Sequence, residues 1–340
     1  MSHPAPETPA ARTVASRLRR ALRILTALSA LCVIAGVIYL QFPWPMSPAT
    51  RLTVVAHRGV HQTFSLENLT NETCTAALIA PPAHTYLENT LPSMAAAFAA
   101  GADEVEIDLH RTADGQLVVF HDWTLECRTD GSGVTNQQSL ADLQRLDVGY
   151  GYTADGGATY PLRGVGVGMM PSLPEVLTAF PDARFILDDK DGDAATRDLL
   201  GQYLASLTPG DRARLAYWGS GYGEIQALAP EVQPYLATRA QVRACLGNYL
   251  AMLLTGSLPA GCREQAIGIP YADLTHLPGW PNLILARAHQ AGVPVFITDV
   301  DTPEQLQAVT AFPIDGIQTN RIEIIGPMVA QRRTNDTPAP

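Results

Sequence analysis

Short apolar runs alternate with longer segments of mixed polarity over most of the chain. Eight of these runs are typical of strands, at residues 51–57, 103–110, 183–190, 214–220, 232–238, 266–271, 293–299 and 315–320. Helix-like segments separate them, among them residues 90–101, 172–180 and 282–292. Because strands that alternate with helices form parallel sheets, the pattern predicts an α/β fold, a (β/α)8 TIM barrel over residues 51–328. A doubly wound open sheet is the alternative.

A ninth apolar run, LVVF at 117–120, does not fit the barrel as a parallel strand. Only a few residues separate it from Leu109, whereas a parallel crossover needs about a dozen or more. The intervening TADG has the composition of a turn. We therefore expect a hairpin inserted after the second strand, which returns His121 towards that strand.

The N-terminal part of the chain differs from the rest. Residues 1–20 are rich in Pro, Ala, Ser, Thr and Arg, and we expect a disordered basic tail there. We expect a transmembrane anchor at residues 21–43, and no charge occurs from Ile24 to Thr50. The apolar part reaches roughly the 20 residues that span a bilayer as a helix. The arginines before it favour a cytoplasmic N-terminus.

These features predict a single-pass membrane protein with the barrel in the periplasm or outside the cell. A cleaved signal peptide is the alternative, but a short apolar region and a small-x-small cleavage site are not evident. A buried core helix is a third possibility, and the flanking arginines argue against it. At the other end of the chain, we expect residues 329–340 to form a disordered tail.

Four cysteines follow the apolar segment, and a compartment outside the cytoplasm permits disulfides. Four cysteines allow three connectivities, which the sequence does not distinguish. We favour Cys74–Cys127 and Cys245–Cys262, since each pair would staple one loop region. Four buried free thiols are the alternative.

Composition supports a folded, acidic protein. Hydrophobic residues make up 46% of the 340 residues and charged residues 16%, so a large core is available. The formal net charge of -10 argues against nucleic acid as a partner, because that affinity depends on neutralising phosphates. A local cationic site for a single phosphate remains open. No obligate protein partner is evident.

Acidic side chains occur in two of the predicted strands. Glu106 and Asp108 are two residues apart and therefore share a face, as do Asp188 and Lys190. We expect His57 at the end of the first strand, Glu106 and Asp108 at the end of the second, and Asp188 and Lys190 at the end of the third. In a TIM barrel the functional groups gather where strands end. Three carboxylates without a thiolate form an oxygen site suited to Mg²⁺ or Ca²⁺.

Each of these residues also has an ordinary structural interpretation. His57 could cap a strand, Glu106 could pair with Arg58, and Asp188 could begin a solvated loop. Their joint placement at successive strand ends favours a site.

At these residues the chain resembles the glycerophosphodiester phosphodiesterases. The shared motifs are VVAHRG (54–59), ENTLPSMAAAF (88–98), GADEVEIDLHRTADGQLVVFHDWTLECRTDGSG (101–133) and GIQTNR (316–321). Each motif alone is weak, but their ordered set is specific. The long segment 60–86 departs from the family, which often has only a short loop there.

The resemblance implies a TIM barrel that hydrolyses glycerophosphodiesters to sn-glycerol 3-phosphate and an alcohol, with one divalent cation, Mg²⁺ or Ca²⁺. It implies a role for each of these residues: His57 and His121 as the acid/base pair, Arg58 and Lys190 as cationic groups at the phosphate, and Glu106, Asp108 and Asp188 as metal ligands. Asp188 stands where the family usually has glutamate. The two cationic side chains would offset negative charge in the transition state, and imidazole suits proton transfer near neutral pH.

Further residues are candidates for lesser roles. Glu88 and Asn89 would organise the site, and His110 is expected at the surface or in a supporting position. Trp123, Tyr150 and Tyr152 would line the substrate groove or pack a loop; both interpretations stay open.

Two other functions remain possible. A sphingomyelinase D-like or lysophospholipid phosphodiesterase would act on membrane lipids. A membrane-tethered binding module would have lost catalytic residues, and none is missing.

Overall fold

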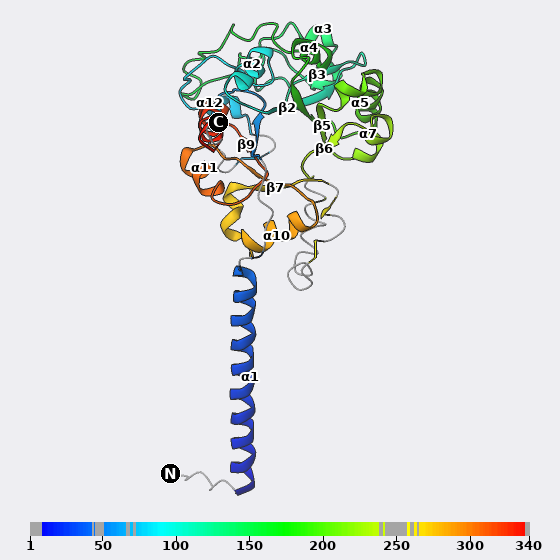
Figure 1. Cartoon of the computed structure of the whole chain (residues 1–340). Helices are drawn as coiled ribbons and strands as arrows, with labels where there is room; N and C mark the ends of the chain where they lie inside the picture. The colour runs from blue at the N-terminus through cyan, green and yellow to red at the C-terminus, as the bar shows by residue number, and fades with distance from the viewer. Residues whose placement is uncertain are drawn as a thin grey trace.

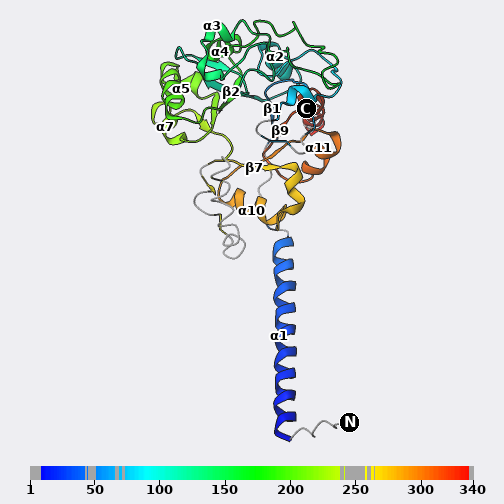
Figure 2. The same cartoon turned by 180° about the vertical axis from the view of Figure 1, so that it is seen from behind.

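The computed structural model describes residues 9–42, 44, 51–65, 69–70, 73–237, 241, 257–258, 262–263 and 265–336. A rounded body carries one long helix, α1 (Pro9–Gln41), that extends away from it (Figure 1). The body is the predicted α/β fold. Helices surround a central set of strands in both views (Figures 1 and 2).

The strands form one parallel sheet in the order β6-β5-β4-β2-β1-β9-β8-β7. Its members are β1 (Thr53–His57), β2 (Glu104–Arg111), β4 (Arg184–Asp189), β5 (Leu215–Trp218), β6 (Gln233–Pro234), β7 (Ile267–Pro270), β8 (Val295–Thr298) and β9 (Gly316–Thr319). A parallel bridge between Leu236 and Ala266 joins the two ends of this order. The predicted eight-stranded barrel is therefore confirmed.

Helices follow most of the strands, as a (β/α)8 barrel requires. The longer ones in the body are α2 (Leu91–Ala99), α4 (Leu173–Ala179), α5 (Ala194–Ser206), α7 (Tyr222–Leu228), α10 (Asn282–Gln290), α11 (Pro303–Val309) and α12 (Ile322–Asp336). The shorter elements are the α-helical turns α3 (Leu140–Leu143) and α6 (Pro209–Arg212), and the 3₁₀ segments η1 (Thr75–Leu78), η2 (Thr135–Gln137) and η4 (Tyr271–His276).

Local sequence explains where these helices begin and end. The Thr90 hydroxyl accepts a hydrogen bond from the Ser93 amide at the start of α2, and Gly101 follows its end with a φ of 103°. Ser172 and Glu175 form a capping box at the start of α4. The predicted boundaries of both helices are thereby accounted for.

The predicted hairpin is present. β3 (Leu117–Val119) pairs antiparallel with β2, with Leu109 opposite Val119. To make this pairing, β2 continues to Arg111, beyond the residues that pair with β1. Glu106 and Asp108 consequently lie inside β2, and the expectation that they end the strand is wrong.

A second hydrophobic cluster, separate from the barrel core, lies among the loops around this hairpin. We call the described parts of residues 60–87 and 117–171 the cap. Its buried side chains are Ala76, Ile79, Leu87, Val118, Phe120, Leu125, Leu143, Val148, Tyr152, Leu162 and Met170. The predicted Cys74–Cys127 disulfide joins two segments of the cap, with a Cα–Cα distance of 5.4 Å. Cys245 lies outside the described residues, so its pairing with Cys262 stays a prediction.

The N-terminal helix begins earlier than expected. Residues 9–20 belong to α1, so the predicted disordered tail is wrong over this range. Once the apolar segment is helical, each further residue adds one backbone hydrogen bond without a new nucleus, and Ala and Arg are good helix formers. Residues 19–41 are long and apolar enough to cross a membrane, a property that signal sequences share.

The end of α1 contacts α10 of the barrel. The Asn282 side chain donates a hydrogen bond to the Gln41 carbonyl at 3.3 Å. The Arg287 guanidinium lies 4.6 Å from the centre of the Trp44 ring and 3.5 Å from the Tyr39 hydroxyl. The barrel and the helix are thus held together by several polar contacts.

The C-terminal part of the chain also differs from expectation. α12 continues to Asp336, so residues 329–336 are helical and not a disordered tail. The Arg333 guanidinium binds the Asp103 carboxylate and the Leu52 carbonyl, which lie before β2 and β1. A tertiary contact therefore stabilises the last turns of this helix, and the local sequence does not reveal it. Residues 337–340 lie outside the described range.

Candidate active site

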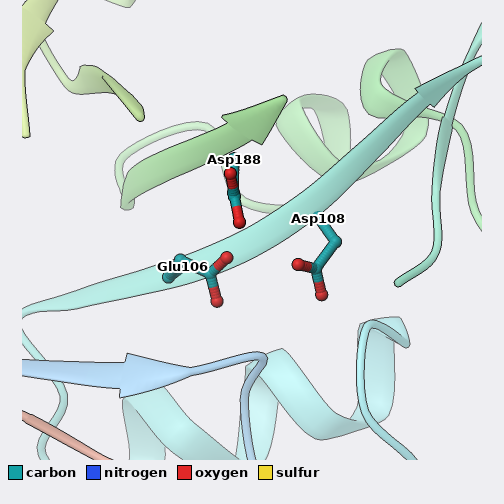
Figure 3. A group of neighbouring side chains, drawn as sticks. All are labelled: Glu106, Asp108 and Asp188. Atoms are coloured by element: carbon teal, nitrogen blue, oxygen red, sulfur yellow. The ribbon is translucent and has the colours of Figure 1, made fainter. Parts of the chain in front are cut away.

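Three carboxylates meet where β2 and β4 lie side by side. Asp108 and Asp188 are direct neighbours in the parallel register, and Glu106 precedes Asp108 on the same face. One oxygen of each side chain lies within 4.8 Å of the others (Figure 3). The structure brings together the three residues predicted as metal ligands.

The chemistry of this cluster suits a hard divalent cation. Glu106 and Asp108 are fully buried, and Glu106 Oε1 has no hydrogen-bond partner among the described residues. Burial and the neighbouring carboxylates raise the pKa of Glu106 well above its usual range. Burial, with Asp108 nearby, also raises the pKa of Asp188 to about 6. A cation would relieve this repulsion and occupy the orphaned oxygen, and an all-oxygen donor set fits Mg²⁺ or Ca²⁺.

Two cationic side chains border the cluster. Lys190 Nζ lies 3.3 Å from Asp108 Oδ1 and 3.2 Å from Asp188 Oδ2. Arg58 Nε lies 3.1 Å from Asp108 Oδ2. Burial opposes both charges, but the carboxylates outweigh it and raise the pKa of each group. Both side chains are therefore positively charged at neutral pH.

Glu88 and Asn89 contact these groups, and their predicted supporting role stays a prediction. The Glu88 carboxylate lies 3.2 Å from Arg58 Nη1. Asn89 donates from Nδ2 to Asp108 Oδ2 at 2.6 Å and accepts from the Asp108 amide. Arg58 and Asn89 have left-handed backbone conformations, with φ of 60° and 61°. These conformations are uncommon outside glycine, and they occur here at residues that face the site.

The first predicted histidine, His57, is oriented by an amide. His57 Nδ1 lies 2.7 Å from Asn320 Oδ1. Asn320 Nδ2 donates to the carboxylates of Asp301, at 2.9 Å, and Asp299, at 3.3 Å. Because carboxylates only accept, the Asn320 oxygen must face His57, and His57 Nδ1 carries the proton. His57 Nε2 is then unprotonated when the ring is neutral, and it lies 3.7 Å from Glu106 Oε2.

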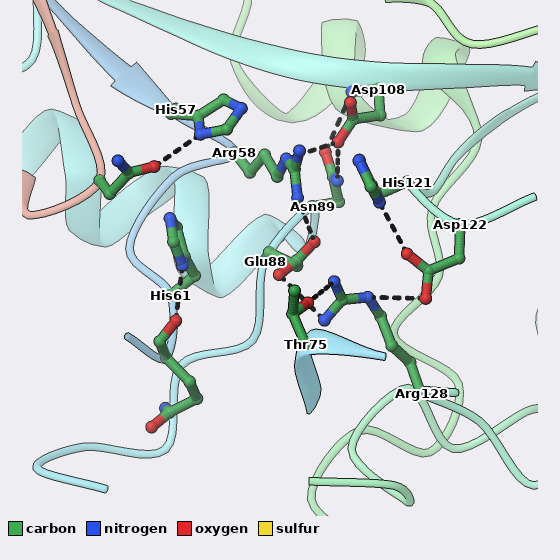
Figure 4. A network of polar contacts seen from close by, with 12 residues as sticks. His57, Arg58, His61, Thr75, Glu88, Asn89, Asp108, His121, Asp122 and Arg128 are labelled. Atoms are coloured by element: carbon green, nitrogen blue, oxygen red, sulfur yellow. Dashed lines mark hydrogen bonds and ion pairs between the residues drawn. The ribbon is translucent and has the colours of Figure 1, made fainter. Parts of the chain in front are cut away.

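The second predicted histidine, His121, is oriented by a carboxylate. Its Nδ1 donates to Asp122 Oδ1 at 2.6 Å. Burial and the Arg58 charge lower the pKa of His121, although Asp108 and the bond to Asp122 oppose this. For His57, burial and Arg58 lower the pKa well below its usual value. Arg58 lies between the two rings (Figure 4).

His110 contacts both the end of the hairpin and the loop that follows β4. Its side chain is buried, and Nδ1 lies 2.6 Å from Asp191 Oδ1 while Nε2 lies 3.3 Å from the His121 carbonyl. A surface position is therefore wrong for His110, and a supporting role stays a prediction.

The three aromatic candidates have different environments. Trp123 is 53% exposed, and its ring lies edge-on to His110 at 6.2 Å. The Tyr150 ring is covered by the Arg163 guanidinium at 4.1 Å, so its role in a groove stays a prediction. Tyr152 is only 2% exposed and does not line a groove. The loop places it in the cap, because Gly151 before it packs against the Cys127 carbonyl with no space for a Cβ.

The structure adds residues that the sequence interpretation did not single out. These are Asp122 and Arg128, which lie behind His121, and Asn320 and Asp301, which lie behind His57 (Figure 4 shows the first group). Asp122, Arg128 and Asn320 lie within the quoted motifs, whereas Asp301 follows the predicted strand at 293–299. Asp122 could have been identified from the sequence, because it is a carboxylate directly beside the candidate histidine His121.

Comparisons with known proteins agree with this geometry. The sequence profile described as "Glycerophosphoryl diester phosphodiesterase family" matches residues 57–195. A glycerophosphodiester phosphodiesterase of Bacillus subtilis is 36% identical over 111 residues, which span 31% of this chain and 36% of that protein. A second Bacillus subtilis protein, YhdW, provisionally named as a glycerophosphodiester phosphodiesterase, is 40% identical over 245 residues, 70% of this chain and 90% of that one.

Solved structures share the fold. An Oleispira antarctica phosphodiesterase, in complex with the product sn-glycerol-3-phosphate, superposes with a TM-score of 0.55. The match covers 82% of this chain and 96% of that one at 20% identity. By its sequence relatives and its barrel, this chain belongs to the glycerophosphoryl diester phosphodiesterase family, a family of phosphodiester hydrolases.

Proposed function

We propose that the protein hydrolyses glycerophosphodiesters to sn-glycerol 3-phosphate and an alcohol, with His57 and His121 as the acid/base pair. The observation that carries this proposal is the arrangement of two oriented imidazoles around Arg58, beside three carboxylates and Lys190. The product named in the Oleispira antarctica structure supports the same reaction. Glu106, Asp108 and Asp188 would hold the cation.

The partners of the two histidines favour different roles. A carboxylate stabilises an imidazolium, so Asp122 favours the protonated form of His121. The neutral Asn320 amide stabilises protonated His57 less than an anion would. Burial and Arg58 lower the pKa of both rings, and that of His57 lies well below its usual value. We assign His57 as the base and His121 as the acid in the first step, since environments that separate two pKa values separate the roles.

The proton transfers follow from these assignments. His57 Nε2 accepts the proton of the attacking glycerol hydroxyl as its oxygen forms a bond to phosphorus. The bond from phosphorus to the leaving alcohol breaks, and His121 donates its Nε2 proton to that oxygen. The first step thus leaves a cyclic phosphate ester of glycerol. Water then opens this ring, with His121 as the base and His57 as the acid.

Positive charge around the phosphate favours both steps. Arg58 and Lys190 are charged and would contact the phosphate oxygens, where the transition state gathers negative charge. A bound divalent cation would add positive charge at the same oxygens and lower the pKa of a coordinated hydroxyl.

We also place the catalytic domain on the outer side of a membrane, held by α1. The apolar window from Arg19 to Gln41 and the Cys74–Cys127 disulfide both fit this location. A barrel held beside a bilayer could also reach lysophospholipids, and this is the second candidate substrate class.

The proposal is tested with the full-length protein in lipid nanodiscs. We expect release of sn-glycerol 3-phosphate from glycerophosphocholine in the presence of Mg²⁺ or Ca²⁺, with loss of activity in EDTA and in His57→Ala. Lysophosphatidylcholine and sphingomyelin are assayed in parallel. Release of choline from an intact lipid, without hydrolysis of glycerophosphocholine, would contradict the proposed reaction.

A further inference from the structure

Arg128 connects the two halves of the candidate site, although it lies in neither the metal cluster nor the histidine pair. Its side chain is buried in the cap, behind His121 and Arg58 (Figure 4). Nε lies 3.0 Å from Asp122 Oδ2, and Nη1 lies 3.2 Å from Glu88 Oε2. Nη1 also donates to the Tyr152 hydroxyl at 2.8 Å, and Nη2 donates to Thr75 Oγ1 at 2.7 Å.

Each carboxylate bound by Arg128 uses its other oxygen to hold a site residue. Asp122 Oδ1 accepts from His121 Nδ1, and Glu88 Oε1 lies 3.2 Å from Arg58 Nη1. The Arg128 guanidinium therefore contacts two carboxylate bridges. The Asp122 bridge leads to the His121 imidazole, and the Glu88 bridge leads to the Arg58 guanidinium. A lysine at this position could not reproduce them, since its single ammonium lacks the planar fork of donors.

The charge of Arg128 keeps both carboxylates ionised. Burial alone would raise the pKa of Glu88, but Arg128 and Arg58 lower it to about 2. Burial likewise opposes ionisation of Asp122, and Arg128 is the largest influence that lowers its pKa. A protonated carboxyl would hold the His121 ring or the Arg58 guanidinium less strongly, because charged hydrogen bonds are about twice as strong as neutral ones.

An ordinary structural arginine would need only enough acceptors to satisfy its donors. Arg214 is such a residue, since it donates to the carbonyls of Phe180 and Ala183 and pairs with Asp211. None of these partners belongs to the candidate site. Arg128 differs because each of its two carboxylate partners also contacts a residue that would act on the substrate.

We propose that Arg128 is a positioning residue that sets the orientation of His121 and of Arg58 together. The proposal rests on the proposed function for its catalytic meaning. It predicts that loss of the Asp122 bridge impairs proton transfer by His121, whereas loss of the Glu88 bridge impairs phosphate binding by Arg58.

Arg128→Lys tests this in the full-length protein, with Arg214→Lys as the matched control. For glycerophosphocholine we expect Arg128→Lys to lower kcat by about tenfold or more, a usual scale for impaired acid/base catalysis, and to raise KM severalfold. Asp122→Asn should lower kcat with little change in KM, and Glu88→Gln should mainly raise KM. Arg214→Lys should leave both constants unchanged.

A spectroscopic measurement separates positioning from folding. The His121 Nδ1 proton, bonded to Asp122, should give a downfield proton resonance, assigned by its loss in His121→Gln. We expect this resonance to disappear in Arg128→Lys and to persist in Arg214→Lys. Asp122, Arg58, Asp108 and Lys190 are the charged groups around His121, so the spectra are compared at one fixed pH.

Three results would overturn the proposal. One is a folded Arg128→Lys protein with wild-type kcat and KM. Another is a loss of activity that matches Arg214→Lys, with the His121 resonance intact. If Arg128→Lys does not fold, identical changes in kcat and KM for Asp122→Asn and Glu88→Gln would refute the two-bridge arrangement. An inactive wild-type protein would refute the proposed function, whereas the resonance would still decide whether Arg128 positions His121.

Discussion

Thr75 Oγ1 accepts a hydrogen bond from Arg128 Nη2 at 2.7 Å, and each of these residues directly follows one cysteine of the Cys74–Cys127 disulfide. The disulfide closes a sequence separation of 53 residues. It therefore fixes the two segments that meet at Arg128, which in turn contacts the partners of His121 and Arg58. The disulfide and the hydrogen bond between Thr75 and Arg128 therefore join the same two segments of the cap.

The double variant Cys74→Ser/Cys127→Ser should lose both stability and activity. Opening a loop of this length frees chain entropy in the unfolded state worth about 4 kcal/mol. We expect a lower melting temperature and, below it, a lower kcat on glycerophosphocholine. The control is Cys32→Ser, which changes the free cysteine of the described residues. An unchanged melting temperature in the double variant would contradict the role of the disulfide.

Asp188→Asn should abolish cation binding, whereas Asp189→Asn should not. Asp188 belongs to the carboxylate cluster, while the adjacent Asp189 faces away and accepts from the Gly192 amide and the Tyr217 hydroxyl. Isothermal titration with Mg²⁺ and Ca²⁺ measures the affinity of each variant. Equal loss of affinity in the two variants would indicate an indirect structural effect in place of ligation.

The stability of the cation-free protein should reveal the cost of ionising Asp188, which comes from its burial and from the nearby Asp108. The pKa of Asp188 is raised to about 6 in the folded state. At pH values between the ordinary pKa of an aspartate and about 6, the folded protein therefore binds more protons than the unfolded chain. The contribution of the Asp188 carboxyl to stability is therefore full in acid and is lost as the pH rises through about 6. In EDTA, Asp188→Asn should be more stable than wild type above this pH, by on the order of 2 kcal/mol.

Thermal unfolding of wild type and Asp188→Asn at several pH values checks this, because the difference between them removes the contributions of other groups. The gain in stability should shrink as the pH is lowered towards about 5 and should vanish when the cation is added to wild type. A gain that is independent of pH would mean that the substitution acts through packing.

The two histidine assignments predict opposite effects on the pH profile of kcat/KM. Asp122→Asn removes an anion that stabilises the His121 imidazolium, so the pKa of the acid falls and the basic limb moves to lower pH. Asn320→Asp places an anion beside His57, so the pKa of the base rises and the acidic limb moves to higher pH. Movement of the same limb in both variants would show that the roles are not divided in this way.

The barrel and its acidic cluster could be predicted from sequence because both depend on regular spacings between residues that are close along the chain. Side chains two residues apart in a strand share a face, so the spacing of Glu106 and Asp108 is enough to place them side by side. The turn residues before Leu117 similarly define the hairpin that carries His121. Regular local geometry is what the pattern of residues encodes directly.

Features that depend on distant contacts could not be predicted. The helix to Asp336 is stabilised by Arg333 against Asp103, a residue more than 200 positions away. Tyr152 is buried because Gly151 packs against the Cys127 carbonyl, a contact between two loops. The roles of Arg128 and Asn320 likewise depend on partners that only the folded chain brings together.

The contacts between α1 and α10 predict that α1 is retained in the mature protein. Arg287 lies over Trp44, and Asn282 binds the Gln41 carbonyl, so removal of α1 would leave polar groups of α10 without these partners. We expect the mature protein to keep its N-terminal residues by intact mass and to stay in the membrane fraction after alkaline carbonate extraction. The variant Leu28→Lys/Leu31→Lys places two charges inside the apolar window, at an insertion cost of about 3 kcal/mol each, and should be released from the membrane. A mature protein that begins after Trp44 and is found in the soluble fraction would identify α1 as a signal sequence, and the proposed membrane anchoring would then be wrong.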